Sequence, residues 1–351
     1  MTATPSPKKL NILVFGAGAI GGYLGGSMAL RGHRVGFFEQ ESAAAMLQKN
    51  GLRLRLPSGD HHIHAPTVYT KLDTALSMGN YDAMFFAVKA FHTKSALETL
   101  LPFAGHLPRL YCFQNGVDNE ILLTDSLGKE NVVACTVTTA IERPAFGNVG
   151  VGKLRGIGIA KQDEQARILT AGMNDAGLNV RTYDHAPSLK WSKLLTNLIA
   201  NPLSAILDLH PREIFAHPGL FELEMEQLRE TIRVMKEHGA RIIDLPGTPV
   251  RALGFAAQYV PSVIARPILG KQLGAGRGTK MPSFHIELHR GSPVSEVEYL
   301  HGAVVRYGER YGVPTPVNAF LTKTLVQLHE QKLPLDTYAK QPDKLIAHLK
   351  S

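Results

Sequence analysis

A lysine and two asparagines stand at regular spacing in the otherwise apolar stretch Trp191–Pro202. Lys193, Asn197 and Asn201 are each four residues apart, so a helix would place all three on one face. An ammonium on a largely buried helix is costly unless it is paired or used, and desolvation lowers its pKa toward values that suit proton transfer. Two amides beside it can orient a carbonyl or a carboxylate. A lysine that extends to solvent beside two loop-capping amides would have the same spacing.

A strand, a glycine turn and a helix follow one another between Asn11 and Gly22. The apolar run Ile12–Phe15 has the length and composition of a buried parallel strand. In a GxGxxG turn the first glycine allows the tight bend, the second lets a pyrophosphate approach, and the third allows close helix–strand packing. The helix N-terminus adds positive potential for the phosphates. The whole turn is therefore predicted to bind a dinucleotide: Gly16, Ala17, Gly18, Ala19, Ile20 and Gly21.

A carboxylate lies near the end of the second predicted strand, Arg34–Gln40. Glu39 stands about where a Rossmann fold places an acid on the 2′-hydroxyl of the adenosine ribose. A carboxylate there would repel a 2′-phosphate, and Gln40 adds no positive charge, so this position favours NAD(H) over NADP(H). Arg34 and Lys89 could still supply a positive charge from elsewhere. A solvated strand end would also account for Glu39.

Strands and helices alternate through the first half of the chain. The further strands predicted there are Tyr81–Val88, Leu110–Phe113 and Asn131–Ala140. Lys89 and Asn115 follow the first two of them, at carboxyl ends where doubly wound sheets bind ligands. The glycine-rich segment Gly147–Ile159 predicts antiparallel strands at the edge of the sheet. The pattern indicates an α/β Rossmann domain with a doubly wound, mainly parallel sheet.

The pattern becomes helical after about Asp184. The predicted helices are Leu189–Leu207, Pro218–Gly239, Thr248–Tyr259 and Glu296–Tyr311. We therefore expect a disordered tail over residues 1–10, a dinucleotide-binding Rossmann domain over residues 11–184, and an all-α substrate and catalytic domain over residues 185–345. Within the second helix, the spacing of charged side chains predicts a solvated face: Glu222, Glu224, Glu226 and Arg229.

Composition agrees with a cytoplasmic enzyme. The 351 residues can hold two domains, and no apolar run reaches the length of a membrane span. The net charge of +8 suits anionic substrates, and no Lys/Arg block or nucleic-acid motif accompanies it. Cys112 and Cys135 lie in apolar segments and are predicted to be reduced and buried. We expect no metal site, because the histidines near residue 62 have no acidic or cysteine neighbours at ligand spacing and are typical of an exposed hairpin.

Five motifs occur in the order seen in ketopantoate reductases (2-dehydropantoate 2-reductases). They are the glycine turn, Val88–Ala90, Gln114–Gly116, Trp191–Pro202 and Glu296–Gly302. The chain resembles this family from about Asn11 to Leu328. The resemblance implies an N-terminal Rossmann domain and a C-terminal helical domain, with the active site in the cleft between them. It also implies NADP(H) as cofactor, in contrast to the NAD(H) that Glu39 and Gln40 favour.

The same resemblance assigns roles to individual residues. It makes Lys193 the catalytic lysine, which bonds the 2-oxo group of the substrate and protonates the alkoxide formed by hydride transfer. Glu296 would be the acidic partner across the cleft. The remaining contacts that it implies are Asn197, Asn201 and Ser283 to substrate, Lys89 to cofactor, and Asn115 to both nicotinamide ribose and substrate.

The chain departs from the family on the substrate side. Lys280 stands where some members have an asparagine, His301 replaces the asparagine of the Glu-x-Asp-Tyr-x-Asn-Gly pattern, and Phe284 and His285 replace Met-Leu. Gln40 stands where these enzymes usually have an arginine. The sequence thus predicts a reductase of a small anionic 2-oxoacid, with ketopantoate in pantothenate biosynthesis as the leading candidate.

Two other functions remain open at the level of sequence. One is an NAD-dependent 2-hydroxyacid dehydrogenase of the same family with a different substrate. The other is a regulator that binds the dinucleotide without turnover, although binding alone needs neither Lys193 nor Glu296. The sequence leaves a homodimer open, and it specifies neither the acid, the product stereochemistry nor the physiological direction.

Overall fold

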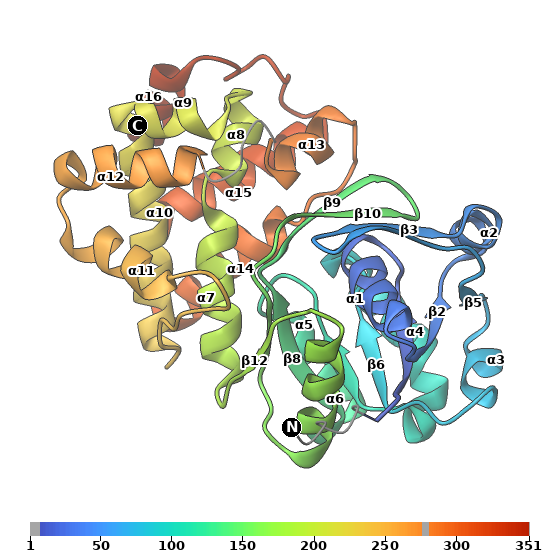
Figure 1. The fold of residues 1–351 in the computed structure, drawn as a ribbon. Coiled ribbons are helices and arrows are strands. Elements are labelled where there is room, and N and C mark those ends of the chain that lie inside the picture. The colour runs from blue at the N-terminus through green and yellow to red at the C-terminus, as the bar shows by residue number, and fades with distance from the viewer. Residues whose placement is uncertain (1–7, 276–280, 351) are drawn as a thin grey trace. The chain divides into compact units, whose positions relative to one another are not determined.

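The structure is a computed structural model that describes residues 8–275 and 281–350. The chain divides into two compact units (Figure 1). Unit 1 runs to Lys190 and includes Leu245–Thr248, and unit 2 comprises Trp191–Asp244 and the residues from Pro249 onward. Residues 1–7 of the predicted tail lie outside the described residues. Lys8 and Leu10 are held in place, because Lys8 Nζ lies 2.9 Å from Asp82 Oδ1 and the Leu10 side chain is buried.

Unit 1 is built on an eight-stranded sheet in the order β12-β11-β8-β7-β6-β1-β2-β5. The strands from β8 to β5 in this order are parallel, whereas β11 runs antiparallel to β8. The strands are β1 (Asn11–Phe15), β2 (Arg34–Phe38), β5 (Thr67–Tyr69), β6 (Ala83–Phe86), β7 (Leu110–Cys112), β8 (Val132–Val137), β11 (Ile157–Ile159) and β12 (Val180–Thr182). The predicted doubly wound, mainly parallel sheet is confirmed.

Helices cover both faces of this sheet, because the apolar side chains of its strands alternate between two cores. Ile12 and Val14 of β1 belong to one core, and Leu13 and Phe15 belong to the other. The first core receives α1 (Ala19–Leu30) and α6 (Glu164–Asp175). Packed against the second core are α3 (Leu72–Ser77), α4 (Thr93–Leu100) and α5 (Asn119–Leu127). The remaining helix of this part of the chain, α2, spans Glu41–Asn50.

A second, four-stranded sheet covers the other side of α1. Its order is β4-β3-β10-β9, with β3 (Leu52–Leu56), β4 (Gly59–Ile63), β9 (Ala140–Ala145) and β10 (Asn148–Lys153). The glycines of α1 allow this packing, since a Cβ on Gly22 would lie 3.0 Å from Val149 and one on Gly26 would lie 2.5 Å from Leu54. The segment Gly147–Ile159 was predicted to form antiparallel strands at the edge of one sheet. This is wrong, because β10 joins the four-stranded sheet and β11 joins the larger one. The hairpin predicted at the histidines is confirmed as β3–β4.

Unit 2 contains helices as its only regular elements among the described residues, as predicted. They are α8 (Asn201–Leu207), α9 (Pro211–Ala216), α10 (Pro218–Glu237), α11 (Val250–Tyr259), α12 (Ser262–Ala275), α13 (Ser283–His289), α14 (Val297–Tyr311), α15 (Pro316–His329) and α16 (Pro342–Lys350). The helix α7 (Ala186–Leu198) begins in unit 1 and continues into unit 2. The central helix α10 caps α15, since the buried Glu230 accepts N–H bonds from Val317 and Asn318 at 2.8 and 2.9 Å.

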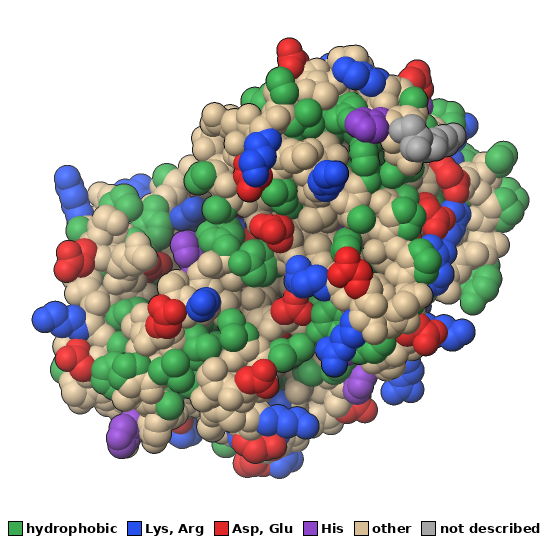
Figure 2. Space-filling view, turned by 180° about the vertical axis from the view of Figure 1, so that it is seen from behind, with side chains coloured by type: hydrophobic (Ala, Val, Ile, Leu, Met, Phe, Trp, Pro, Cys, Tyr) green, Lys and Arg blue, Asp and Glu red, His purple; other side chains and the backbone are tan. Residues whose placement is uncertain are grey.

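Surface charge is mixed. On the face in Figure 2, Lys and Arg side chains alternate with Asp and Glu rather than gathering in one block. Within the described residues, no helix combines the length and the hydropathy needed to span a membrane.

Candidate active site

The turn between β1 and α1 has the geometry of a phosphate-binding loop. Gly16 has φ = +95°, a conformation that favours glycine. A Cβ on Gly21 would overlap the carbonyl oxygen of Gly16, so only glycine permits this helix to start so close to the strand. A Cβ on Gly18, in contrast, would meet no protein atom within 4 Å, and no side chain caps the start of α1. The turn therefore presents the N-terminus of α1 to an open space beside Gly18, as binding of a pyrophosphate requires.

Glu39 lies directly after β2 and folds back onto this turn. Its Oε1 accepts a hydrogen bond from the Ala17 N–H, and its Oε2 accepts one from the Gln40 N–H at 3.3 Å. Burial raises the pKa of the Glu39 carboxyl, while these hydrogen bonds and the charge of Arg143 act in the opposite direction. The carboxylate is thus held at the glycine turn, the place where a Rossmann fold binds the adenosine ribose.

The loops that follow β6 and β7 carry Lys89 and Asn115 and are tied together by the Gln114 side chain. Gln114 Nε2 donates to the Val88 carbonyl at 3.0 Å and to Thr93 Oγ1 at 2.9 Å. Asn119 Nδ2 donates to the Asn115 carbonyl at 2.7 Å. Since β1, β2, β6 and β7 are parallel and lie next to one another in the sheet, their loops meet at one edge. This edge brings together the cofactor residues predicted from the sequence.

A buried lysine, Lys190, supports the loop that carries Asn115. It was not among the site residues predicted from the sequence. Lys190 Nζ donates to the Gln114 carbonyl at 2.6 Å and to the Cys135 carbonyl at 3.2 Å, and it lies 2.6 Å from Glu120 Oε1. The two side chains are only 5% and 12% exposed. Burial alone would lower the pKa of Lys190, but the Glu120 carboxylate outweighs it and raises that pKa. The available signal was a second lysine in the same apolar helix, one turn before Lys193.

The cysteines lie beside this ion pair. Cys112 and Cys135 are free and completely buried, which confirms the prediction of reduced, structural thiols. Burial raises the pKa of both thiols well above the usual range.

The helix that carries Lys193 is shorter than predicted. The helix α7 ends at Leu198, Ala200 adopts the left-handed conformation with φ = +53°, and α8 starts at Asn201. The prediction of one continuous helix over Leu189–Leu207 is therefore wrong. The reason is Pro202, which has no N–H to continue the helix and instead occupies the first turn of a new one.

Lys193 and Asn197 remain one turn apart on α7, both half-buried. Asn201 is 4% exposed and joins two segments of unit 2 through its amide. Its Nδ2 donates to the Asn197 carbonyl at 3.2 Å, and its Oδ1 accepts from the Phe284 N–H at 3.1 Å. Ser283 Oγ lies 3.4 Å from the same amide group. Asn201 thus positions Ser283, the residue expected at the substrate carboxylate, relative to the end of α7.

Buried polar groups on α10 hold the break between α7 and α8. Glu224 Oε2 accepts the Ala200 N–H at 2.9 Å and a bond from Gln227 Nε2 at 2.8 Å. Glu224 is completely buried, so its predicted place on a solvated helix face is wrong. The other members of that set, Glu222, Glu226 and Arg229, form ion pairs on the outer face. They are spaced by three and four residues, whereas Glu224 points the other way.

Glu296 occupies the N-cap position of α14 and is 4% exposed. One turn and a half later on the same helix, His301 is completely buried and its Nε2 lies 3.1 Å from Gln227 Oε1. Burial lowers the pKa of His301 to about 3, so this imidazole is neutral at neutral pH. The histidine that replaces the family's asparagine is thus part of the network behind the α7–α8 break, through Gln227 and Glu224.

The depressed pKa of His301 predicts acid lability. Unfolding restores a pKa of about 6.5, so below pH 6.5 the unfolded state binds a proton that the folded state excludes, and stability falls with pH. A folded pKa of about 3 corresponds to a loss of about 2 kcal/mol at pH 5 relative to pH 8. We expect His301→Asn to abolish this part of the pH dependence, measured as urea-unfolding free energies of both proteins at the two pH values. Equal pH dependence of the two proteins would contradict the assignment.

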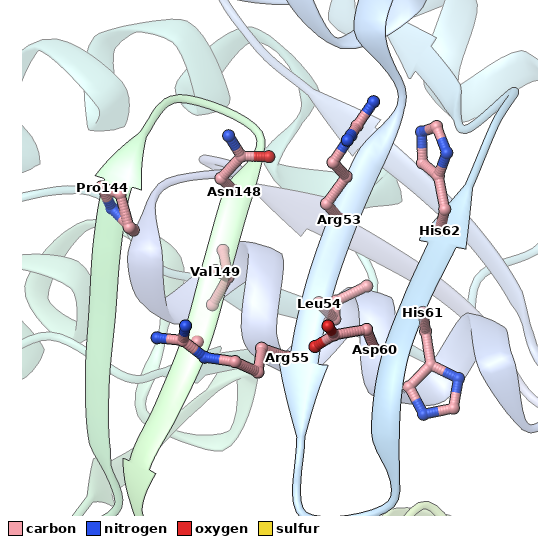
Figure 3. A pocket seen from close by; sticks show the side chains of 10 residues that line it. Arg53, Leu54, Arg55, Asp60, His61, His62, Pro144, Asn148 and Val149 are labelled. Carbon is pink, nitrogen blue, oxygen red and sulfur yellow. The ribbon is translucent and has the colours of Figure 1, made fainter.

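Lys280 lies outside the described residues. A pocket of about 420 Å³ lies elsewhere, on the four-stranded sheet (Figure 3). Side chains of β3, β4 and β10 line it, among them Arg53, Asp60, His62 and Asn148. None of the predicted site residues contributes to it.

An open glycine turn, an acid at the end of the second strand and a half-buried lysine in an apolar helix are the features expected of a dinucleotide-dependent oxidoreductase with a Rossmann unit. The family model described as ketopantoate reductase PanE/ApbA matches residues 12–162. The model for the C-terminal part of the same family matches residues 187–329. The chain therefore belongs to the ketopantoate reductase family, whose members are oxidoreductases acting on CH–OH groups.

Individual relatives agree with this membership. A 2-dehydropantoate 2-reductase of Mesorhizobium japonicum is 26% identical over 332 residues, covering 88% of this chain and 94% of the relative. The crystal structure of a PanE/ApbA family ketopantoate reductase from Ralstonia eutropha JMP134 has a TM-score of 0.76 and 27% identity, covering 92% and 99% of the two chains. D-mandelate dehydrogenase in complex with NADH and anilino(oxo)acetate shares the fold, with a TM-score of 0.75 at 18% identity over 93% of this chain and 99% of that one.

Proposed function

We propose that the protein reduces a small anionic 2-oxoacid, with ketopantoate as the leading candidate and Lys193 as the general acid. The observation that carries the proposal is the half-buried Lys193 on an apolar helix, with Asn197 one turn later on α7. Residues 11–184 would form the cofactor domain and residues 185–345 the substrate and catalytic domain. The names of the matching relatives and the family support this reading.

The residues of unit 1 fit a nicotinamide dinucleotide. The space beside Gly18 and the uncapped start of α1 suit a pyrophosphate, and Glu39 stands at the ribose position. Lys89 and Asn115, at the ends of neighbouring strands, would contact the remainder of the cofactor. When bound, the reduced nicotinamide supplies the hydride for the ketone carbon.

The side chains of this protein would supply binding and the proton. Hydride arrival at the ketone carbon leaves negative charge on oxygen, which the Lys193 ammonium stabilises before it donates a proton to that oxygen. Asn197 would orient the 2-oxo group, and Ser283 would donate its hydroxyl to the carboxylate of the substrate. Asn201 would act chiefly by positioning Ser283, whose Oγ lies 3.4 Å from Asn201 Nδ2. Glu296 would orient the substrate or a water.

Glu39 favours an alternative function, that of an NAD-dependent 2-hydroxyacid dehydrogenase of the same family with a different substrate. The Glu39 carboxylate, held at the end of β2 by the Ala17 N–H, would repel a 2′-phosphate. D-mandelate dehydrogenase, whose fold is similar, binds NADH. We therefore propose NADH as the preferred cofactor, whichever 2-oxoacid is the substrate.

Initial rates test both parts of the proposal. Ketopantoate and a panel of 2-oxoacids, each with NADH and with NADPH, are compared for the wild type and for Glu39→Gln. We expect 2-oxoacid-dependent oxidation of NADH, and a smaller NADH preference in Glu39→Gln because the repulsion of a 2′-phosphate is gone. Turnover of ketopantoate with NADPH alone would refute the cofactor assignment. Dinucleotide binding without turnover of any acid would refute the proposal that the protein reduces a 2-oxoacid.

Two glycines of the same turn separate cofactor binding from folding. In Gly18→Ala the new methyl group meets no protein atom, so we expect an unchanged melting temperature and cofactor affinity at least about tenfold weaker, because the methyl occupies the pyrophosphate space. In Gly21→Ala the methyl overlaps the Gly16 carbonyl, so stability itself should fall. Fluorescence titration with NADH and thermal melts check this contrast. Unchanged NADH affinity in Gly18→Ala would place the pyrophosphate elsewhere.

A further inference from the structure

Three potential metal ligands converge in unit 2 at the C-terminal end of α8. Asp208 directly follows α8, and His285 and His289 lie on α13. One ligand atom from each of the three side chains lies within 4.8 Å of the other two. The proposed reaction uses none of them, and the sequence did not point to them as a group.

Local structure explains why these side chains meet. His289 lies four positions after His285, so both imidazoles lie on one face of α13, with ring centroids 4.1 Å apart. Asp208 ends α8 in the left-handed conformation, with φ = +50°. The helices α8 and α13 lie side by side (Figure 1), and the Phe284 N–H at the start of α13 donates to Asn201 Oδ1 at the start of α8.

The distances bracket those of a transition-metal site. Asp208 Oδ1 lies 2.8 Å from His285 Nε2 and 3.9 Å from His289 Nε2. Around a tetrahedral Zn²⁺ with bonds of about 2.0–2.1 Å, ligand atoms are about 3.3–3.4 Å apart. A metal ion would therefore replace the hydrogen bond between His285 and Asp208 after changes of about half an ångström in these two distances.

A backbone carbonyl beside the group also agrees with a metal site. The Ala205 carbonyl acts on the His289 ring in the direction of a hydrogen-bond acceptor, and carbonyls of this kind fix the ring orientation and tautomer of metal-binding histidines. The Asp208 and His289 side chains are 43% and 35% exposed, so an ion and a water ligand can reach the group.

Lys340 is the competing cation. Its Nζ donates to the Asp208 carbonyl and lies 3.6 Å from Asp208 Oδ2. Its side chain is 58% exposed and can move into solvent when an ion binds. Its presence weakens a metal site without preventing one, and removing it should increase affinity.

We propose that Asp208, His285 and His289 bind Zn²⁺ or a similar borderline divalent cation, with solvent as a further ligand. The ion fastens the C-terminal end of α8 to α13, the helix that begins at Ser283. This proposal is independent of the oxoacid and the cofactor, because it concerns other side chains and can be measured without turnover.

Metal titration of chelator-treated protein without an affinity tag tests the site. We expect one equivalent of Zn²⁺ by calorimetry, visible absorption from Co²⁺, and a Zn²⁺-dependent rise in melting temperature that excess chelator reverses. His289→Asn should weaken Zn²⁺ binding at least about 100-fold, since loss of an outer partner alone costs 10–100-fold. Lys340→Met should strengthen it.

A matched control comes from a second pair of neighbouring histidine rings. The His62 and His64 rings are 3.9 Å apart in unit 1, and His64→Asn should leave Zn²⁺ affinity unchanged. No saturable binding, or equal loss in His64→Asn and His289→Asn, would overturn the proposal. If His289→Asn has a lower melting temperature than the wild type even without metal, the Lys340→Met variant provides the test. Zn²⁺ affinity in Lys340→Met that is weaker than or equal to that of the wild type contradicts the site.

Discussion

Replacing Lys193 by alanine should lower kcat by roughly 10²–10⁴-fold, the range that a positioned general acid contributes. The substitution removes both the charge that stabilises the alkoxide and the proton that completes the reduction. Cofactor affinity should be unaffected, because the glycine turn, Glu39 and Asn115 all lie in unit 1. Single-turnover hydride transfer, followed by loss of NADH absorbance with saturating oxoacid, measures the effect without interference from product release.

Two further variants make the Lys193 result specific. Lys193→Arg keeps a positive charge but cannot release a proton near neutral pH, so it should recover at most part of the rate. Lys236 is an exposed lysine on α10, and Lys236→Ala should leave kcat unchanged. If Lys193→Ala kept more than about a tenth of the wild-type kcat, Lys193 would not be the general acid.

Replacing Lys190 by methionine should cost about 3–5 kcal/mol of unfolding free energy. The substitution leaves the Glu120 carboxylate, only 12% exposed, without its cation, and breaking a buried pair from one side has a cost of this size. The Gln114 carbonyl also loses a donor at 2.6 Å, so the Asn115 loop loses its support. We expect cofactor affinity to fall as well. Urea unfolding and NADH titration measure the two effects.

The double variant and a surface pair serve as controls for Lys190. Glu120→Gln combined with Lys190→Met removes the stranded charge and should restore most of the stability, while cofactor affinity stays low. Lys161 lies 2.9 Å from Glu130 in an exposed pair, for which loss of one partner should cost less than about 1 kcal/mol. A loss in Lys190→Met as small as in Lys161→Met would show that the buried pair does not support the fold.

Local sequence patterns predicted the geometry of the glycine turn between β1 and α1 well. A short apolar run, glycines at defined spacing and a helical pattern lie within Asn11–Leu30, and each feature depends on near neighbours. The left-handed Gly16 and the close approach at Gly21 are the conformations for which these glycines were expected. Glu39 also lies at the predicted place, but its bond to Ala17 could not be foreseen from spacing.

The helix that carries Lys193 was predicted less well, because one proline and tertiary contacts together decide its end. Apolar periodicity continues through Ala200, and Asn201 is compatible with a helix, so the only local signal for a break was Pro202. The buried Glu224 satisfies the Ala200 N–H from another helix. Its burial, like that of Lys190, depends on a partner distant in sequence and could not be read from the charge pattern of α10 alone.

The second sheet has a consequence for the order in which the chain folds. In that sheet β3 pairs with β10, so Arg53 lies opposite Asn148, and four of the eight strands of the large sheet are synthesised between them. Closing so long a loop is slow, and contacts of this separation form late. We therefore expect the glycine face of α1 to stay uncovered in early folding intermediates, with amide protection of β3 and β10 appearing after that of β1 and β2.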